Sequence, residues 1–426
     1  MIDEAQDMNF EEYGLVDALM EQNEEMRVIA VGDDDQNIFA FRKADSKYME
    51  QLITGKGAVK YELIENYRSK RNLVSFANQF VTKIQHRLKE LPIVAKQQDD
   101  GKIKLFYYNS ENLINPLVND IVSSGISGST GILTKTNEEA LQIAGMLNQK
   151  GITAKLIQSH DEFNLYNLLE IRYFFNELNS MDGSPVISDE DWENAKKSLL
   201  RKYGDSSRIE ICLNLIRDFE ATNTRKKYKS DLEVFIKESK IEDFIGENSE
   251  TVLVSTIHKA KGKEFDNVFL LLDNFNAITD DAKRQLYVAI TRAKQNLTTH
   301  TNNNHFEDIA TSNQVIEDNK QSFPTASTLI KQLTHKDVYL NYFEFIQNRI
   351  LPLKCGENLS VNSEGCKNTK DEKVMKFSKQ FMEFIASHEQ MGYKLKVAKI
   401  NFMVWWKKPD EEKELLIVLP EVYFEK

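Results

Sequence analysis

Short apolar segments that alternate with helical segments most strongly constrain how this chain of 426 residues can fold. Between residues 102 and 157 a strand pattern occurs three times, and helical spacing separates the copies. Further strand patterns follow at 251–257 and 267–272, and a helical pattern covers 281–294. Consecutive strands that are joined through helices run parallel in one sheet. The sequence therefore predicts an α/β fold with a parallel sheet and helical crossovers.

The alternating pattern is interrupted between residues 158 and 250. Helical spacing dominates this stretch and strand patterns are scarce, so we expect an all-helical insertion there. The α/β domain that it interrupts consists of residues 94–157 and 251–312. Residues 301–326 are rich in Asn, Thr and Ser, and we expect them to form a linker.

The N-terminal residues 1–93 form a separate segment. An apolar run that ends in a glycine, within 27–36, predicts a buried parallel strand whose C-terminal loop faces a ligand. A second short strand is expected at 61–66, and a helix is expected from Ser69 to about Lys89.

The C-terminal residues 320–426 predict a small α+β module. One helix is expected at 373–388. The two alternating segments that follow, KVAKINFMVWW and ELLIVLPEVYF, are separated by KKPDEE, which is typical of a hairpin turn.

Composition limits the kind of protein. Hydrophobic residues at 41% and charged residues at 28% are typical of a soluble globular protein, and the absence of a long apolar run or a basic signal segment argues against a membrane partner. Cys212, Cys355 and Cys366 lie far apart and form no C-x-x-C pair, so we expect a cytoplasmic protein without a disulfide framework. The formal net charge of −11 argues against a generally basic nucleic-acid surface.

Residues 3–7 read DEAQD, which is the form of a Walker-B segment. Asp3 is a candidate ligand for Mg²⁺, because this ion prefers hard oxygen ligands and keeps several waters. Glu4 could orient, or take a proton from, the water that attacks a γ-phosphate. The alternative is an acidic N-terminal cap. No segment of the form G-x-x-x-x-G-K-[ST] occurs in the 426 residues, so the phosphate loop that normally accompanies such a site is missing from this sequence.

Residues 32–42, GDDDQNIFAFR, contain a glycine, an amide and two aromatic residues at close spacing. Gln36 is neutral and can both donate and accept, so it could sense a γ-phosphate and a water together. Phe39 and Phe41 beside Arg42 are typical of a stacking platform for unpaired bases. The alternative is that both phenylalanines belong to the core.

Two arginines follow secondary-structure elements in positions where a nucleotide site would use them. Arg68 in ENYRS could neutralise phosphoryl charge, although a lone arginine there is more often part of a weak surface salt bridge. Arg292 in LYVAITRAK could act as an arginine finger, although the helix dipole also favours a cation at that end.

The segment TIHKAKGKEF, at 256–265, combines a histidine, lysines, a glycine and an acid. His258 and the lysines could meet a phosphate backbone, and Gly262 would allow close approach. Glu264 could hold a ribose hydroxyl. A lone histidine is more often structural, so this segment gains weight only from its context.

In this order the five segments resemble the motifs of superfamily 1 DNA helicases of the UvrD/Rep/PcrA type. DEAQD is similar to motif II, GDDDQNIFAFR to motif III, ENYRS to motif IV, TIHKAKGKEF to motif V and LYVAITRAK to motif VI. The resemblance covers roughly residues 1–300. It implies a P-loop NTPase fold with two RecA-like domains. Residues 1–93 would supply an incomplete first domain, and 94–157 with 251–312 the second.

The resemblance also implies ATP and Mg²⁺ between the two domains and movement from 3′ to 5′ on single-stranded DNA. Carried over residue by residue, Asp3 and Glu4 would bind Mg²⁺, and Glu4 would be the catalytic base. Gln36, Arg68 and Arg292 would contact the γ-phosphate.

The remaining roles implied by the resemblance concern the ribose and the nucleic acid. Glu264 would meet the ribose, with Gly262 beside it. The DNA path would be lined by Phe39, Phe41, Arg42, Thr256 and His258.

Two functions from different classes follow. The first is the C-terminal part of an ATP-dependent DNA helicase whose phosphate loop is supplied by an N-terminal helicase half, in the same parent chain or in a partner chain. The second is a non-catalytic module that binds single-stranded nucleic acid or a protein and has an incomplete nucleotide site. RNA as the track remains open, because a stacking platform does not distinguish the sugars.

Overall fold

A computed structural model describes most of the chain and shows two compact units. The described residues are 1–23, 25–125, 127–157, 164–180, 184–239, 241–244, 252–408 and 411–426. Unit 1 comprises Met1–Ile143, Ile152–Ile157 and Glu250–Ala326. Unit 2 comprises Ala144–Gly151, Gln158–Ser249 and Ser327–Lys426.

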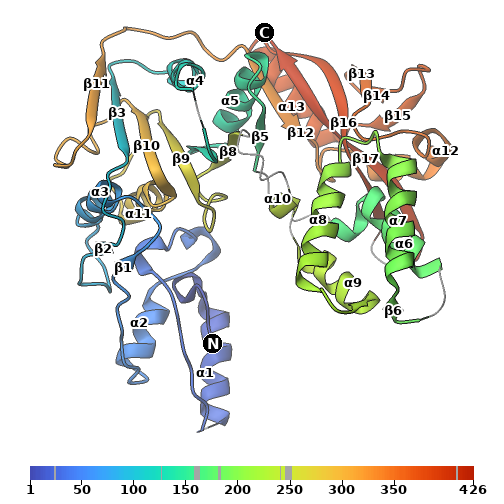
Figure 1. The fold of residues 1–426 in the computed structure, drawn as a ribbon. Coiled ribbons are helices and arrows are strands. Elements are labelled where there is room, and N and C mark those ends of the chain that lie inside the picture. The colour runs from blue at the N-terminus through green and yellow to red at the C-terminus, as the bar shows by residue number, and fades with distance from the viewer. Residues whose placement is uncertain are drawn as a thin grey trace. The chain divides into compact units, whose positions relative to one another are not determined.

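A seven-stranded sheet forms the framework of unit 1 (Figure 1). All its strand pairings are parallel, which confirms the α/β prediction. In spatial order the strands are β11 (Gln314–Asp318), β3 (Lys102–Tyr108), β10 (Ala293–Thr301), β9 (Phe265–Leu272), β4 (Thr130–Thr134), β8 (Val252–Thr256) and β5 (Ala154–Leu156).

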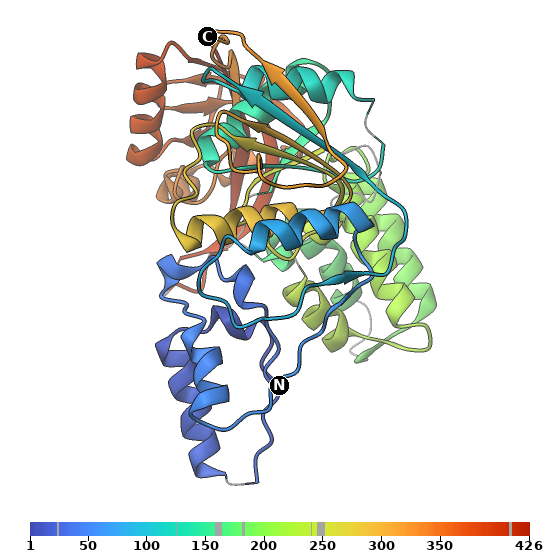
Figure 2. The same cartoon turned by 90° about the vertical axis from the view of Figure 1, so that its left-hand side faces the viewer.

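Helices complete this unit and join its strands. The helix pair α3 and α11 lies side by side against the sheet (Figure 2). The α-helices that begin in unit 1 are α1 (Phe10–Gln22), α2 (Lys47–Thr54), α3 (Arg71–Val81), α4 (Ile114–Ser123), α5 (Asn137–Gln149) and α11 (Asp280–Ile290).

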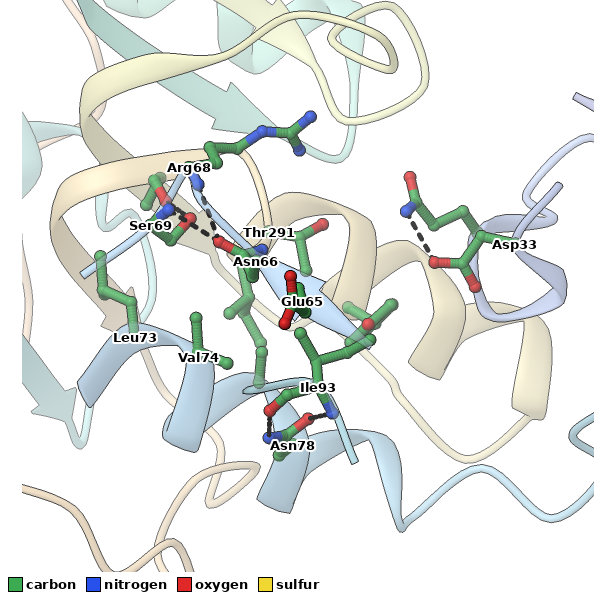
Figure 3. A pocket seen from close by; sticks show the side chains of 15 residues that line it. Asp33, Glu65, Asn66, Arg68, Ser69, Leu73, Val74, Asn78, Ile93 and Thr291 are labelled. Carbon is green, nitrogen blue, oxygen red and sulfur yellow. Dashed lines mark hydrogen bonds between the residues drawn. The ribbon is translucent and has the colours of Figure 1, made fainter. Parts of the chain in front are cut away.

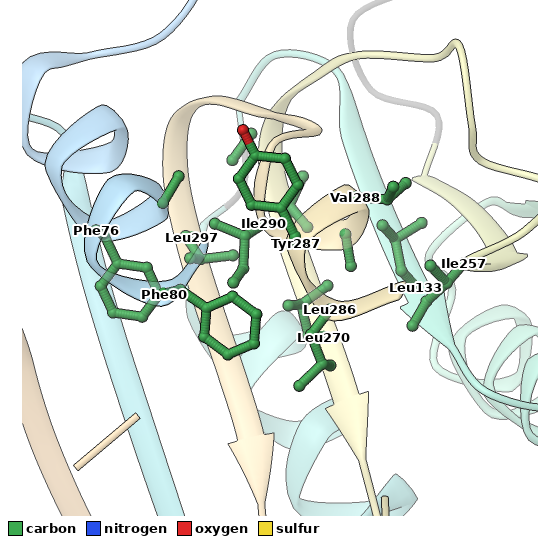
Figure 4. Close-up of a cluster of buried hydrophobic side chains, with 14 of the residues drawn as sticks. Phe76, Phe80, Leu133, Ile257, Leu270, Leu286, Tyr287, Val288, Ile290 and Leu297 are labelled. Atoms are coloured by element: carbon green, nitrogen blue, oxygen red, sulfur yellow. The ribbon is translucent and has the colours of Figure 1, made fainter. Parts of the chain in front are cut away.

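The core of unit 1 fills the space between the pair α3 and α11 and the sheet (Figure 4). Phe76 and Phe80 are spaced one turn apart on α3, so they face the same side of that helix. They are fully buried, as are Leu286 of α11 and Leu270 of β9. This packing fixes the C-terminal end of α11, and therefore the position of the chain that follows it.

Two boundaries after residue 280 differ from the sequence prediction. The helix expected at 281–294 ends at Ile290, and Ala293 already begins β10 in the interior of the sheet. The expected linker 301–326 contains β11, which pairs in parallel with β3. Strand pairing with distant residues decides both boundaries, and local composition does not report it.

The N-terminal segment departs further from the prediction. The run at 27–36 forms no strand; only an isolated parallel bridge joins Ile2 and Ala30. Ile29 is 62% exposed, so the expectation of a buried strand was wrong. The strand expected at 61–66 shrinks to β1 (Glu65–Asn66), which pairs with β2 (Val94–Ala95).

The predicted helix from Ser69 to Lys89 is also shorter than expected. It is α3, which ends at Val81, and the following residues form irregular turns. Three 3-10 turns complete this region: η1 (Ala5–Asp7), η2 (Asp34–Gln36) and η3 (Ala40–Arg42).

Unit 2 combines the helical insertion with the C-terminal module. The described insertion is largely helical, as expected, with one short antiparallel pair, β6 (Val186–Ile187) and β7 (Lys227–Tyr228). Its helices are α6 (Leu169–Ser180), α7 (Asp189–Tyr203), α8 (Ile209–Thr222), α9 (Lys229–Glu238) and α10 (Ile241–Phe244), and the 3-10 turn η4 is Leu165–Asn167.

The C-terminal module is a six-stranded antiparallel sheet with α13 (Lys379–Gln390) and the short segments η5 (Leu340–Phe345) and α12 (Gln347–Ile350). The predicted hairpin is confirmed, and Pro409 and Asp410 of its turn lie outside the described residues. The helix expected at 373–388 is in fact a strand followed by α13. In spatial order the strands are β12 (Thr328–Gln332), β17 (Glu414–Glu425), β16 (Lys394–Lys407), β13 (Asn358–Asn362), β14 (Gly365–Lys367) and β15 (Lys373–Lys376).

The insertion and the C-terminal module contact one another directly. Leu168 forms an antiparallel bridge with Val404, and Arg172 pairs with Glu414 at 3.0 Å. The half-buried side chain of Arg208 stacks on Phe402, with 4.9 Å between the guanidinium carbon and the ring centroid. Two sequence segments that the hydropathy pattern separates therefore fold as one unit.

Across the residues described by the structure, no helix is both long and apolar enough to span a bilayer.

Gly131→Ala should destabilise unit 1 selectively. A Cβ atom at Gly131 in β4 would lie 2.4 Å from the ring of Phe265, so we expect a loss of about 1–3 kcal/mol. The matched control is Gly14→Ala in α1, where no atom lies within 4 Å of the added Cβ and helix propensity predicts a gain of up to about 1 kcal/mol. Thermal unfolding followed by far-UV circular dichroism measures both.

All three tryptophans lie in unit 2, so their fluorescence provides an internal reference. The fluorescence transition should not move in either variant. A Gly131→Ala protein that unfolds at the wild-type temperature by circular dichroism would contradict the packing described for β4 and β9.

Candidate functional site

The acidic segment at residues 3–7 and the GDDDQ loop lie side by side. The amide of Val31 donates to the Ile2 carbonyl at 2.8 Å, and the amide of Ala5 donates to the Val31 carbonyl at 2.8 Å. Gly32 makes this approach possible, because a Cβ atom there would lie 2.4 Å from Gln6 Oε1 and 3.0 Å from the Ala5 nitrogen. Two segments that were predicted separately therefore form one structural element.

The two predicted metal ligands lie at the exposed end of this element. Asp3 and Glu4 are both exposed, and Glu4 has left-handed backbone geometry with φ 49°. Glu4 Oε2 accepts a hydrogen bond from Gln6 Nε2 at 2.5 Å. Both carboxylates are therefore accessible to solvent.

Lys261 is one of the lysines that were expected to meet a phosphate backbone, and its contact with the acidic segment was not predicted. Its ammonium lies 3.5 Å from Glu4 Oε2 and 2.5 Å from Asp7 Oδ2. Burial raises the pKa of Asp7, and the Lys261 contact offsets part of that rise. Lys261 stands between His258 and Glu264 in the same motif, so this position within TIHKAKGKEF was the available signal.

The three aspartates of GDDDQ are close enough to hold a cation, but two of them already pair with basic side chains. Among the described residues they are the only group of three or more acidic, histidine or cysteine side chains with that spacing. Arg87 forms a bidentate pair with Asp35 at 2.8 and 2.9 Å, and Lys89 lies 2.6 Å from Asp33. These contacts occupy the oxygens that an ion would need.

Gln36 and Arg292, which lie 256 residues apart, meet directly. Arg292 Nη2 donates to Gln36 Oε1 at 2.9 Å. The guanidinium is 3% exposed and also donates to the carbonyls of Val288 and Lys263, at 3.0 and 3.3 Å. The contact with the Val288 carbonyl, in the last turn of α11, also fits the alternative of a cation that interacts with the C-terminal end of a helix.

Burial and the nearby positive charge of Arg68 lower the pKa of Arg292, which is about 10. The acids Glu264 and Glu4 act in the opposite direction. Even so, Arg292 is charged at neutral pH. The two guanidiniums and the two acids therefore lie within electrostatic range of each other.

Arg68 forms an ion pair with Glu264, and both side chains are about one-third exposed. The Asn66 side chain accepts hydrogen bonds from the amides of Arg68 and Ser69, at 3.0 and 2.8 Å, which fixes the turn after β1. Gly262 adopts φ +82° in an exposed position two residues before Glu264. Glycine permits that turn without strain.

A pocket of about 120 Å³ adjoins Gln36 and Arg68. Figure 3 shows Asp33 on one side of it, Leu73 and Val74 on the other, and Arg68 above them in the view. The pocket thus combines charged groups with an apolar wall from α3.

The aromatic residues form a second surface close by. The Phe41 ring lies 5.8 Å from Phe39 and 5.6 Å from His258, centroid to centroid. The Arg42 guanidinium lies over both phenylalanine rings, at 5.3 and 5.8 Å, and the Lys261 ammonium lies 5.0 Å from the Phe39 ring. Phe41 is 69% exposed, so the alternative that both phenylalanines are core residues was wrong.

Thr256 and His258 occupy different environments. Thr256 is 7% exposed at the end of β8, and its carbonyl accepts from the amides of Lys259 and Ala260. His258 is half-buried in the aromatic cluster. Of the five residues expected on a DNA path, four therefore gather at one place, and Thr256 lies beneath the turn that presents His258.

Comparison with known proteins identifies the family. The model of the UvrD-like helicase C-terminal domain matches residues 61–184 and 186–304, which is more than half of the chain. The model of the UvrD/REP helicase N-terminal domain matches residues 1–55. The chain belongs to the UvrD-like helicase family, and the resemblance inferred from its motifs is confirmed.

Individual relatives are distant. A putative ATP-dependent DNA helicase, YjcD, from Bacillus subtilis is 23% identical over 70% of this chain and 50% of its own length. The Gabija protein GajB from Bacillus cereus is 23% identical over 79% of this chain and 67% of its length. ATP-dependent DNA helicase UvrD2 from Mycobacterium tuberculosis is 21% identical over 70% of this chain. The chain spans about half the length of the first and third of these relatives.

A solved structure of the C-terminal domain of a possible DNA helicase from Lactobacillus plantarum is also matched. The match covers 59% of this chain and 98% of that one, at 14% identity and a TM-score of 0.29. A score of that size does not establish a common overall fold.

We expect His258 to be neutral at pH 7. Burial against Phe39 and Phe41 lowers the pKa of the imidazole below its ordinary value of 6.5. An NMR titration of the histidine ring protons, assigned with a His258→Gln variant, should give a midpoint below 6.5. A midpoint above 7 would mean that the ring is not packed as described.

Proposed function

We propose that the chain is the C-terminal part of an ATP-dependent helicase that moves 3′ to 5′ on single-stranded DNA. The single observation that carries this proposal is the contact between Gln36 and the buried guanidinium of Arg292, with Arg68 nearby. Two guanidiniums held near one another repel, and an anion between them would relieve the repulsion. A γ-phosphate is the anion that this family's motifs imply.

The acids fit the other half of such a site. Exposed carboxylates at Asp3 and Glu4 suit Mg²⁺, which keeps part of its water shell. When bound, the ion would neutralise phosphate charge. Glu4 would orient or deprotonate the attacking water, and Gln36 would hold that water from the opposite motif. Glu264, beside Gly262, would receive the ribose.

The domain assignment follows from the same family. Residues 1–93 would form part of a first RecA-like domain, and 94–157 with 251–312 the second. Residues 158–250 would be the insertion, and 320–426 a C-terminal module. The buried free cysteines suit a reducing compartment such as the cytoplasm.

The phosphate loop would come from another polypeptide segment, in the same parent chain or in a partner. Support comes from apolar side chains that face solvent in the N-terminal segment: Ile29 at 62%, Val59 at 74%, Tyr61 at 85% and Leu63 at 84% exposed. An exposed apolar group of this kind marks a contact surface. We propose that it packs against the part of the first domain that carries the phosphate loop.

The cluster of Phe39, Phe41, Arg42 and His258 would hold single-stranded DNA. Base stacking on an exposed aromatic ring with a neighbouring cation needs no particular sequence, as a translocating protein requires. A second candidate function, a non-catalytic binding module, uses this same surface.

Arg292→Lys should abolish most ATP hydrolysis. The experiment joins residues 1–426 to a helicase segment that carries a phosphate loop and measures hydrolysis stimulated by single-stranded DNA. Because a lysine cannot reproduce the guanidinium contacts, we expect kcat to fall by at least about 100-fold. Arg217→Lys on the exposed face of α8 is the matched control and should retain wild-type hydrolysis. Hydrolysis that survives Arg292→Lys would contradict the proposed role.

Phe41→Ala should weaken binding of a thymidine oligonucleotide to the 426-residue chain. Loss of one stacking ring should cost about 1–3 kcal/mol, or roughly 5- to 150-fold in Kd. Phe345→Ala is the matched control, because Phe345 is 77% exposed and Phe41 69%. Fluorescence anisotropy at fixed salt measures both. Equal affinities for the two variants would argue against the aromatic cluster as the binding surface.

A further inference from the structure

We propose that residues 85–90 form a clamp that holds the Gln36 side chain against Arg292, with Arg87 and Lys89 as positioning residues of the proposed ATP site. This inference rests on the proposed function. It concerns residues outside the five motifs, in a stretch that the sequence pattern predicted to be the end of a helix.

On one side the clamp holds all three acids of the GDDDQ loop. Arg87 Nε and Nη2 donate to the two oxygens of Asp35, which is 0% exposed. The amide of Leu88 donates to Asp34 Oδ2 at 2.6 Å. Lys89 Nζ lies 2.6 Å from Asp33 Oδ1 and 3.3 Å from Asp35 Oδ2. Three consecutive residues therefore serve three consecutive acids.

On the other side the clamp is fixed to α11. Asp280 Oδ2 accepts from the amides of Gln85 and His86, at 3.0 and 3.2 Å. Arg284 Nη2 donates to the His86 carbonyl at 2.7 Å. Lys89 also lies 5.8 Å from the ring of Tyr287. The N-terminal half of α11 thus sets where the clamp sits.

Asp33 connects the clamp to Gln36. One oxygen of Asp33 meets Lys89, and the other accepts from Gln36 Nε2 at 2.9 Å. An amide can be rotated end for end without a change in shape, so its hydrogen-bond partners decide its orientation. With its nitrogen held by Asp33, Gln36 turns its oxygen to Arg292.

Together these contacts form a continuous chain that begins and ends at α11. The beginning of α11 holds the clamp, the clamp holds the GDDDQ loop, and Gln36 of that loop meets Arg292 just beyond the end of α11. Two of the three groups proposed to contact the γ-phosphate, Gln36 and Arg292, are therefore positioned by one helix. Burial would lower the pKa of Lys89, but the charges of Asp33, Tyr287 and Asp35 raise it above its ordinary value, so the ammonium stays charged.

If the contacts of Lys89 served only to stabilise the fold, its substitution would have a different effect from the one that the clamp predicts. Buried ion pairs add little net stability, and apolar replacements of the whole pair are often tolerated. If the contacts serve only folding, loss of Lys89 changes stability and nothing else. If they position Gln36, its loss changes turnover in a folded protein.

The test variant is Lys89→Met, which keeps the length of the apolar stem. The control is Lys83→Met, because Lys83 also pairs with an acid, Asp308, in unit 1 but does not contact the GDDDQ loop. In the enzyme completed with a phosphate loop, Lys89→Met should lower kcat at least tenfold with Kd for single-stranded DNA unchanged within twofold. Lys89→Arg should restore most of kcat. Lys89→Met should add no further loss to Gln36→Ala.

If the wild-type enzyme hydrolyses ATP and the Lys89→Met variant is equally active, the clamp is overturned and the proposed function stays intact. A wild-type enzyme without hydrolysis would count against the proposed function. The clamp is then tested in the 426-residue chain alone by hydrogen exchange. Lys89→Met should speed exchange of the Gln36 and Asn37 amides, which bond within the loop, at least tenfold over Lys83→Met. Equal exchange in the two variants would overturn the clamp.

Discussion

The hydrogen bond between Gln36 and Arg292 is the contact on which the rest of the site depends. A buried guanidinium is costly unless its donors are satisfied, and here they reach Gln36 Oε1, two backbone carbonyls and the Thr291 hydroxyl. Satisfying it requires the turn after α11 to be held in place, and the hydrophobic packing of α11 against α3 does so. It also requires the GDDDQ loop to stay close, which an isolated loop with three adjacent acids would resist.

Lys261 links the two surfaces of the site. The same ammonium lies 2.5 Å from Asp7, beside the proposed metal ligands, and 5.0 Å from the ring of Phe39 in the aromatic cluster. Its side chain is only 9% exposed, so its position is fixed by contacts with the acidic segment and with the aromatic cluster at the same time. The acidic segment and the stacking platform therefore share one buried cation, and a change in charge at the acids would act directly on the group that packs against Phe39.

Much of this arrangement could be predicted from the sequence, and the part that could not has a common cause. The alternation of strands and helices predicted the parallel sheet, and the motifs predicted Gln36, Arg292 and the cluster around Phe41. The clamp could not be predicted from the sequence, because Arg87 and Lys89 contact acids that are distant along the chain and meet them only in the folded protein. The run at 27–36 has the composition of a buried strand, but Ile29 finds no covering layer in this chain. Whether a residue is buried depends on the surface that packs against it as well as on its own hydrophobicity.

The energetic pattern favours a catalytic origin over a module that only binds nucleic acid. Stacking of bases needs an exposed ring such as Phe41 and a cation such as Arg42, and nothing more. Base stacking does not require Arg292 to be buried near a second guanidinium, an arrangement whose cost is seen in the lowered pKa of Arg292. It also does not require the Gln36 amide to be fixed opposite Arg292. Charged networks of this kind contribute little to folding, since apolar side chains of similar volume would do as well. The proposed helicase function accounts for such a network, because that function would have to hold a triphosphate and cleave it.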